Sequence, residues 1–263
     1  MTTIYTYNLL IPKYLDDKLL CNLSLVSKYW MLVTKEQRLL RNSKKKKCMI
    51  LVRDGDLDGI KILHKYGEDS YLINITQDEY DELYYKYYTI FKFRKIKEWN
   101  IMDFACLFGN LDIVEWIHKN RIKCCTTDAM NLASSQGHLD IVKWIHENRT
   151  EGCTTYAMDY ASSYGHLEVV KFLHENRTEG CTTNAMDLAS VHGHLEVVKF
   201  LHNNRTEGCT TNAMDKASYY GRLEVVKFIH ENRTEGCTTY AMDCASANGH
   251  LEIVKFLKEN IKK

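Results

Sequence analysis

Apolar and polar residues alternate along the C-terminal two thirds of the chain with the spacing of short amphipathic helices. In the segment 167–176, Leu167, Val170 and His174 follow one another at intervals of three and four residues. Val169 and Leu173 widen the same stripe. Because this spacing places the side chains on one face of an α-helix, we expect a helix that buries this face.

A shorter helix is predicted just before it, in "TTYAMDYASSYG" (154–165). Its threonines suit an N-cap, and Asp159 falls in the expected first turn, where a carboxylate interacts favourably with the helix dipole. Met158 and Ala161 share a face. Gly165 then ends the helix, because glycine readily adopts a positive φ. Together the two segments predict a helix-turn-helix unit.

The unit recurs with a period of 28 residues. The turn glycine marks each copy: Gly109, Gly137, Gly165, Gly193, Gly221 and Gly249. We therefore expect six regular units within 97–263: 97–124, 125–152, 153–180, 181–208, 209–236 and 237–263. An earlier stretch, "RDGDLDGIKILHKYG" (53–67), has Gly55 in the same slot and predicts a degenerate unit at about 43–70. The interval 71–96 has nearly the length of one more unit but lacks the glycine, so 43–96 is interpreted as degenerate units.

One such helix pair is too small to bury its own apolar face. Stacking against neighbouring pairs would supply the core, which is the principle of a solenoid. Ala161 and Ser162 are small residues in the middle of the first helix and would let adjacent helices approach closely. The fold class predicted from the pattern is therefore an all-α solenoid of helix-turn-helix units.

The repeated sequence resembles the ankyrin repeat, whose usual form contains T-P-L-H-x-A-A-x-x-G-H-x-x-V-V-x-L-L. Here "YAMD" (156–159) stands for T-P-L-H, while A-x-x-x-G-H-x-x-V-V is intact at 161–170. The units are 28 residues long instead of about 33, so we expect the projecting β-hairpin of ordinary ankyrins to be shortened or absent. Short units with this sequence resemble the ankyrin arrays of amoebae and of the large DNA viruses that infect them.

Differences between the copies concentrate at the fourth, eighth, eleventh and twelfth positions, counted from the cysteine that opens each unit. Helical spacing puts these positions on one side of the first helix, the side that the ankyrin resemblance assigns to the partner-binding groove. The alternative is neutral drift on an exposed face. Large tyrosines favour binding, because such side chains are typical interface anchors. The candidate groove residues are Tyr156, Tyr160, Tyr164, Leu188, His192, Lys216, Tyr219, Tyr220 and Tyr240.

The N-terminal residues 1–42 belong to no unit. Within them, "LSLVSKYW" (23–30) resembles the later half of the F-box, although its opening Leu-Pro-x-Glu is missing. The resemblance implies a small helical module that docks a Skp-type adaptor of a cullin ubiquitin ligase. The candidate adaptor-binding residues are Leu19, Leu20, Leu23, Leu25, Val26 and Trp30. The alternative is an amphipathic cap on the end of the solenoid. The basic run "RNSKKKK" (41–47) suits a solvated linker or a nuclear import signal.

Composition narrows the function classes. A formal net charge of +1 over 263 residues favours neither nucleic acid nor an acidic surface. We expect no secretory signal and no membrane-spanning segment, hence a cytoplasmic protein, in the host cytoplasm if it is viral, with nuclear entry open. The unit cysteines recur too far apart for disulfides and are expected to be small buried residues; a zinc site is the alternative.

No catalytic motif is present, and we expect no enzyme activity, cofactor or metal. Histidines occupy two repeated slots, one after the turn glycine, where ankyrin histidines cap and pack locally, and one on the second helix. The favoured interpretation is a substrate-recognition adaptor: the groove binds a target protein and the F-box-like segment recruits a ubiquitin ligase. The alternative is an ankyrin scaffold or host-factor-binding protein with no ligase link.

Overall fold

The computed structural model of this protein describes residues 48–65, 101–120 and 125–260. Every regular element in these ranges is a helix, and none of these helices is long and apolar enough to span a membrane. The prediction of an all-α chain of helix-turn-helix units is therefore confirmed for the described ranges. The chain divides into two compact units, one of residues 1–105 and 115–124 and another of residues 106–114 and 125–263.

The described part of the first unit includes a short helix pair, α4 (Cys48–Arg53) and α5 (Leu57–Lys65). Gly55 lies between them with φ 68°, which matches the slot that the sequence assigned to a degenerate unit. Later in the chain come α9 (Ile101–Phe108) and α10 (Leu111–Lys119). In this unit the His64 ring contacts Trp116 edge-on, with 5.3 Å between the ring centroids.

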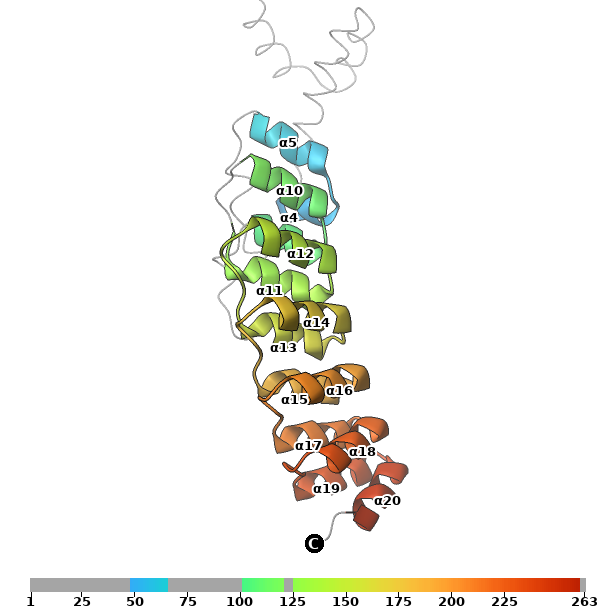
Figure 1. The fold of residues 1–263 in the computed structure, drawn as a ribbon. Coiled ribbons are helices and arrows are strands. Elements are labelled where there is room, and N and C mark those ends of the chain that lie inside the picture. The colour runs from blue at the N-terminus through green and yellow to red at the C-terminus, as the bar shows by residue number, and fades with distance from the viewer. Residues whose placement is uncertain (1–47, 66–100, 121–124, 261–263) are drawn as a thin grey trace, which may run out of the picture. The chain divides into compact units, whose positions relative to one another are not determined.

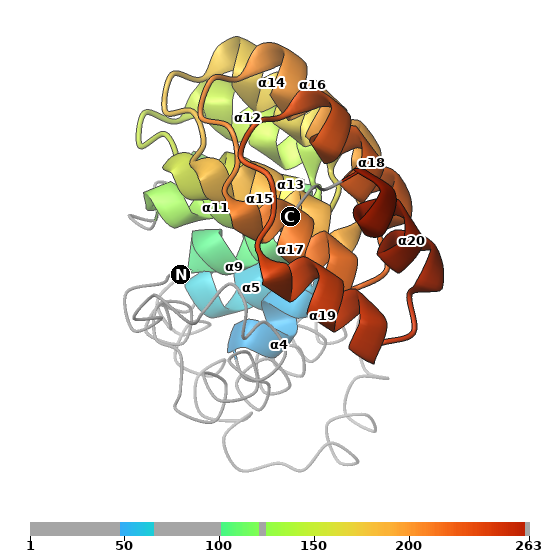
Figure 2. The ribbon, with the colours of Figure 1, turned by 90° about the horizontal axis from the view of Figure 1, so that it is seen from below.

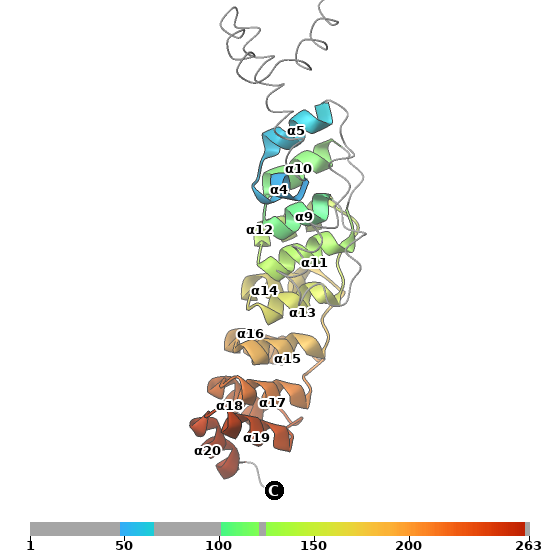
Figure 3. The ribbon, with the colours of Figure 1, turned by 180° about the vertical axis from the view of Figure 1, so that it is seen from behind.

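The second unit is a stack of helix pairs. The first helices contact one another in sequence order, and so do the second helices, so the pairs form two adjoining rows (Figure 1, and from behind in Figure 3). Figure 2 looks along this stack. The pairs are α11 (Thr127–Gln136) with α12 (Leu139–Asn148), α13 (Thr155–Ser163) with α14 (Leu167–Asn176), α15 (Thr183–His192) with α16 (Leu195–Asn204), α17 (Thr211–Tyr219) with α18 (Leu223–Asn232), and α19 (Thr239–Ala247) with α20 (Leu251–Asn260).

Each first helix begins at a threonine and each pair turns at a glycine, as predicted. In α13 the Thr154 hydroxyl accepts a hydrogen bond from the Tyr156 N–H at 3.3 Å, which satisfies a backbone donor that the helix itself leaves open. Gly165 has φ 79°, a conformation that costs most other residues free energy. The His166 N–H then bonds the Ala161 carbonyl at 2.9 Å and closes the turn.

The core consists of apolar side chains from both rows. Val170 is 0% exposed and Val169 and Leu173 are almost as inaccessible, which confirms the centre of the predicted stripe. Leu167 and His174, the outer members of that stripe, are only half-buried. They lie at the first and last turns of α14, where the neighbouring helices cover less of the side chain.

The connection between one pair and the next is short. After α14 ends at Asn176, the chain reaches the Thr182 N-cap without forming a strand, and the equivalent described connections do the same. The expected loss of the projecting hairpin therefore holds in these connections.

Candidate functional site

Behind the candidate groove lies a seam of contacts that joins each pair to the next, and it holds the first helices in register. Asp187 is 6% exposed and accepts two hydrogen bonds from Thr210 of the next pair, from the N–H at 2.8 Å and from the hydroxyl at 2.7 Å. That hydroxyl also accepts the Asn212 N–H at 3.1 Å, as the N-cap of α17. The carboxylate of one pair thus orients the cap of the next. Burial raises the pKa of the Asp187 carboxyl.

This arrangement corrects the sequence prediction for the repeated aspartates. The sequence predicts Asp159 in the first turn of its own helix, but no acidic residue lies in the first turn of α13, α15, α17 or α19. The prediction is therefore wrong for Asp159, and the equivalent residues Asp187, Asp215 and Asp243 lie outside the first turn too. The real cap is the first threonine of each Thr-Thr pair, as Thr154 is for α13, so each helix starts one residue earlier than it would with a cap at the second threonine. An aspartate one turn further along then faces the neighbouring pair. Asp159 and Asp215 repeat the bonds of Asp187, to Thr182 and Thr238.

The same position in α11 holds an amide instead of a carboxylate. The Asn131 amide donates to the Thr154 hydroxyl at 3.1 Å, and its oxygen accepts the Thr154 N–H at 3.0 Å. Since an amide offers both a donor and an acceptor, it keeps the threonine in place without a charge. The contact therefore depends on the hydrogen-bond geometry more than on the negative charge.

The histidine that follows each turn glycine also reaches across the seam. The His166 ring lies against Gly137 of the preceding pair, where an added Cβ would come within 2.6 Å of Nδ1. Its Nε2 is 3.2 Å from the Ser135 carbonyl oxygen. The expectation of a purely local cap is wrong, because this histidine makes no side-chain bond to its own helix.

In the α17–α18 pair an arginine, Arg222, replaces this histidine. Its Nε donates to the Val191 carbonyl at 3.3 Å, in the place where His166 bonds Ser135. The partner is a backbone carbonyl in both pairs and can only accept, so the histidine nitrogen that bonds it donates, as the arginine does. The seam thus tolerates a change of residue as long as a donor remains.

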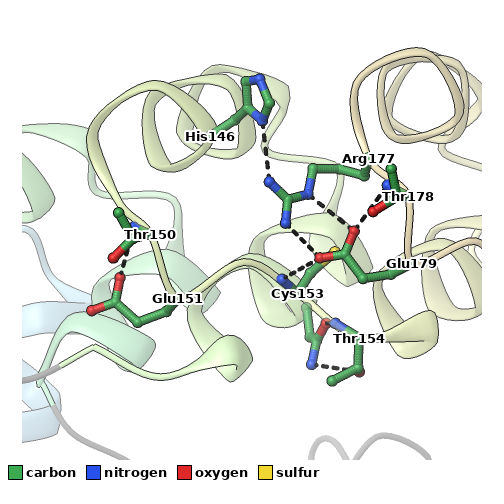
Figure 4. A network of polar contacts seen from close by, with 9 residues as sticks. His146, Thr150, Glu151, Cys153, Thr154, Arg177, Thr178 and Glu179 are labelled. Atoms are coloured by element: carbon green, nitrogen blue, oxygen red, sulfur yellow. Dashed lines mark hydrogen bonds and ion pairs between the residues drawn. The ribbon is translucent and has the colours of Figure 1, made fainter.

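A third seam contact comes from the "RTEG" turn. Arg177 donates to Glu179 in the same turn, and the Glu179 carboxylate accepts the N–H of Cys153, in the connection that leads into α13, at 3.2 Å (Figure 4). Burial alone would raise the pKa of Glu179, but the bonds from Arg177 and backbone N–H groups hold that pKa at about 2. Arg177 also lies 3.5 Å from Nδ1 of His146 in the preceding pair, so the turn connects successive pairs.

The second helices are joined by ring contacts. The His146 ring meets Phe172 of the next pair edge-on, with 5.6 Å between the ring centroids. His174, His202 and His230 make the same contact with the next phenylalanine. The repeated histidines are thus packing residues, and their spacing along the stack does not bring them into one cluster.

The candidate groove lies on the exposed side of the first helices. Tyr156 and Tyr160 stack on α13 with 5.5 Å between the ring centroids and 13° between the ring planes. Tyr164 extends this row, and its ring lies parallel to His192 of α15 at 6.5 Å. The structure therefore brings together residues that the sequence selected only by their variation between copies.

A second group of candidates lies on α17 and α19. The Lys216 ammonium nitrogen is 4.9 Å from the Tyr240 ring centroid and 5.9 Å from that of Tyr219. Tyr219 in turn meets Tyr220 edge-on at 4.7 Å. A cation over aromatic faces and paired rings form a continuous amphipathic patch.

Exposure differs among the candidates. Tyr164, Tyr220 and Tyr240 are 37%, 49% and 42% exposed and are among the few large apolar side chains that remain accessible. Leu188 is half-buried. The eleventh position is not uniformly exposed: Ser135 and Ser163 there are 1% and 4% exposed. Position eleven therefore belongs partly to the seam, and position eight ranges from buried, at Leu132, to half-buried. Positions four and twelve carry most of the exposed surface.

The described residues contain no group of three or more histidine, cysteine, aspartate or glutamate side chains that could hold a metal ion. Burial raises the pKa of Cys153 and Cys181 to about 12. These thiols stay protonated at neutral pH and are poor nucleophiles or ligands. The candidate adaptor-binding residues Leu19, Leu20, Leu23, Leu25, Val26 and Trp30 lie outside the described residues.

Two family models match this stack of helix pairs. One, described as ankyrin repeats in three copies, matches residues 101–187 and 130–215, and the other, described as ankyrin repeats in many copies, matches residues 214–257. Together they span more than half of the chain. The chain belongs to the ankyrin-repeat family. No curated protein matches it.

Ankyrin repeats form protein–protein interaction modules, and an ankyrin fold is typically a binding scaffold rather than an enzyme. In this ankyrin array the recurring aspartate, histidine, arginine and glutamate of successive repeats form the seam, with Asn131 and Arg222 as replacements that keep the contact. Sequence reasoning missed these contacts, because each one joins residues 23 to 31 positions apart. A usable signal was present: a buried polar side chain that recurs at the same place in successive repeats requires a recurring partner.

Proposed function

We propose that the first-helix surface of the ankyrin array binds a target protein, with Tyr156, Tyr160, Tyr164, Tyr219, Tyr220 and Tyr240 as its anchors and Leu188, His192 and Lys216 between them. The observation that carries this proposal is that the surface positions are more exposed than the seam positions and vary more between repeats. The residues that differ between repeats gather into contacting aromatic clusters on one surface, as in Tyr164 with His192 and Lys216 with Tyr240.

The energetics of interfaces support this assignment. Tyrosine offers a large and stiff contact area together with a hydroxyl, and binding free energy concentrates in a few such side chains. Tyr164 and Tyr220 already rest against ring neighbours in the free protein. Little side-chain entropy would therefore be lost on binding.

The test is site-specific photo-crosslinking in cells that contain the natural target. A photoreactive phenylalanine analogue is placed at Tyr160, Tyr164 or Tyr220, and as a matched control at Lys171 or Lys199 on the second helices. We expect the photoreactive residue to crosslink the same protein from each groove position and not to crosslink it from the control positions.

The affinity of that protein for purified variants then decides the assignment. Tyr164→Ala and Tyr220→Ala should each weaken binding by about 1–3 kcal/mol, while Lys171→Glu and Lys199→Glu should change it little. These lysines pair with Glu168 and Glu196 on an exposed helix face, at 2.7 and 2.8 Å. Affinity that falls with the lysine changes and not with the tyrosine changes would place recognition on the second helices.

We further propose that residues 1–42 form an F-box-like module that recruits a Skp-type adaptor, followed by degenerate repeats over 43–96 and regular repeats over 97–263. The support is "LSLVSKYW" at 23–30, which precedes the ankyrin array as a recruiting module precedes a substrate-binding domain. The protein would then be a substrate-recognition adaptor of a cullin ubiquitin ligase, working in the cytoplasm or the nucleus.

Co-purification with a Skp-type adaptor tests this second proposal separately. The full chain should retain the adaptor at micromolar concentration, and Leu25→Asp or Val26→Asp should release it while the helical circular dichroism of the array is unchanged. Failure of the unaltered chain to retain the adaptor would refute the ligase link. The protein would then be an ankyrin scaffold or host-factor-binding protein, and the groove proposal would stand on its own test.

A further inference from the structure

One lysine of the groove lies against two aromatic rings. Lys216 is half-buried on α17, which packs against α19 (Figure 3), and its ammonium nitrogen lies 4.9 Å from the Tyr240 ring centroid and 5.9 Å from that of Tyr219. Tyr219 meets Tyr220 edge-on, and Tyr220 and Tyr240 are 49% and 42% exposed. We call Lys216, Tyr219, Tyr220 and Tyr240 the lysine patch. The rings hold the ammonium group in place but leave its charge uncompensated, because an aromatic ring has no net charge.

Lysines on the second helices have a different environment. Lys171, Lys199 and Lys227 each pair with the glutamate three residues earlier, with 2.7, 2.8 and 3.0 Å between Nζ and Oε1. The residues three and four positions away from Lys216, on either side, are alanine, asparagine and tyrosines. The helix that carries Lys216 therefore offers no carboxylate at the spacing that pairs side chains.

The carboxylate that precedes Lys216 in the sequence is bound elsewhere. Asp215 is 4% exposed and accepts hydrogen bonds from the Thr238 N–H and hydroxyl, at 2.8 and 2.7 Å. Across the ranges that the structure describes, no carboxylate forms an ion pair with Lys216. An ammonium group has three N–H donors, and contacts with two tyrosines do not neutralise it. The lysine patch is therefore a positively charged position that an anionic group of a partner can complete.

The charge of the surrounding surface matches a single carboxylate. At positions four, eight, eleven and twelve of the units that contain α11 to α19, the permanently charged residues are Lys216 and Asp128. Asp128 lies on α11, which the α13 and α15 pairs separate from α17. One positive charge balances one aspartate or glutamate side chain. A phosphorylated side chain carries about two negative charges and is typically bound by a cluster of arginines, which these positions do not contain.

We propose that the lysine patch binds an aspartate or glutamate side chain of the target protein, within a segment whose flanking apolar side chains lie on Tyr220 and Tyr240. The inference rests on the proposed function of the groove and specifies the chemistry that the groove selects. Because the rings exclude water from one side of the ammonium group, its attraction to a carboxylate is screened less than that of an exposed pair. The two exposed tyrosines supply the apolar contact area around this charge.

Selection from a library of random peptides displayed on phage tests the inference with a defined probe. The library is selected on the full chain and on its Lys216→Glu, Lys216→Arg and Lys199→Glu variants. Peptides selected by the unaltered chain should be enriched in aspartate or glutamate beside apolar residues. Lys216→Arg should keep this preference, and Lys216→Glu should replace it by a preference for lysine or arginine. Lys199→Glu makes the same charge change on a second helix and is the matched control, so it should leave the preference unchanged.

Titration calorimetry with the most enriched peptide then measures the pair itself. Lys216→Met in the protein, or replacement of the acidic residue of the peptide by its amide, should each weaken binding at least about fivefold. The two changes together should weaken it little more than either alone, because both remove the same contact. Thermal unfolding of the Lys216→Met protein should be unchanged.

The outcomes separate this inference from the proposal for the groove. Peptides that lose affinity with Tyr220→Ala but show no acidic preference, or whose acidic residue acts independently of Lys216, would overturn the inference and leave the groove as the binding surface. Peptides that depend on Lys199 and not on Tyr220 would place recognition on the second helices and overturn both. Failure to select any peptide that depends on Lys216 would also overturn the inference.

Discussion

Seam residues and surface residues of the first helices lie a few positions apart in every repeat. The seam residues are nearly the same in all copies, whereas the surface residues differ between copies. At the seam, Asp159, Asp187 and Asp215 bond the next threonine with nearly the same distances, 2.7 to 2.8 Å. On the surface, the fourth position of the unit is tyrosine in two repeats and asparagine in two others. Seam residues keep their type or, as Asn131 and Arg222 do, their hydrogen bond to the neighbouring pair, whereas the surface residues vary freely.

The difference separates stability from recognition within a single repeat. A solenoid has only nearest-neighbour interfaces, so a seam contact is required once per pair and any loss is felt locally. The surface side chains contribute less to these interfaces and can change without cost to the fold. If this division is correct, substitutions at the seam should lower the free energy of unfolding, and substitutions on the surface should lower affinity.

The largest effect is expected in the core beside the seam. Val170→Asp places an unpaired carboxylate where the native side chain is 0% exposed. The free energy of unfolding should fall by about 3–5 kcal/mol, as for other buried unpaired charges. Urea unfolding followed by circular dichroism measures it. Lys171→Glu on the exposed side of the same helix is the control, and an equal loss there would mean that the helix faces are assigned wrongly.

A smaller effect is expected for the aspartate of the seam. Asp187→Ala should lower the free energy of unfolding by about 1.5–3 kcal/mol, because the Thr210 N–H and hydroxyl lose a carboxylate acceptor. Asp187→Asn should recover most of the loss, since Asn131 already makes the equivalent contact. Asp243→Ala is the matched control at the equivalent but exposed position of the α19–α20 pair, and it should cost little. Equal losses at positions 187 and 243 would show that the aspartate acts within its own helix.

The histidine contacts predict a dependence on pH. Burial lowers the pKa of His166 and His194 in the folded chain. The unfolded chain therefore binds more protons as the pH falls through about 6.5, the ordinary histidine pKa. The stability these residues contribute is present above that pH and is lost as the pH falls towards their folded pKa. The unfolding midpoint should thus drop between pH 7.5 and 5.5.

A variant with His166→Arg and His194→Arg sharpens this test, because Arg222 occupies the same slot naturally. It should remain folded and lose part of the drop in midpoint over this range. Asp159 and Asp187, whose pKa values burial raises, act in the opposite sense, since what a raised carboxyl pKa contributes is lost as the pH rises. They are present in both proteins, so the difference isolates the histidines. An unchanged drop in the arginine variant would rule out the histidines as its cause.

Much of the array could be predicted from the sequence because its determinants are local. The Thr154 cap, the positive φ of Gly165 and the buried stripe through Val170 each depend on residues within one helix pair. Spacing, capping and turn chemistry are enough for such features. The groove candidates followed from the same helical geometry, which correctly grouped Tyr156 with Tyr160.

The seam could not be predicted in this way. Asp159 in its own repeat looks like a helix cap, and only the stacking of the next pair brings Thr182 to it. The packing distance and rotation between pairs decide which polar groups meet, and neither quantity can be derived from the sequence of a single repeat. Position eleven was misjudged for the same reason: Ser163 follows the helical spacing of the surface, but stacking places it against the next pair, 3.4 Å from His192.

The division between seam and surface is tested most directly by measuring stability and affinity on the same variants. Tyr164→Ala, Tyr220→Ala and their combination should change the free energy of unfolding by less than about 0.5 kcal/mol each, as for other exposed positions. Their affinity for the protein captured at the groove should fall by about 1–3 kcal/mol per tyrosine. A loss of stability as large as that of Asp187→Ala, with affinity unchanged, would contradict the account and make these tyrosines part of the fold.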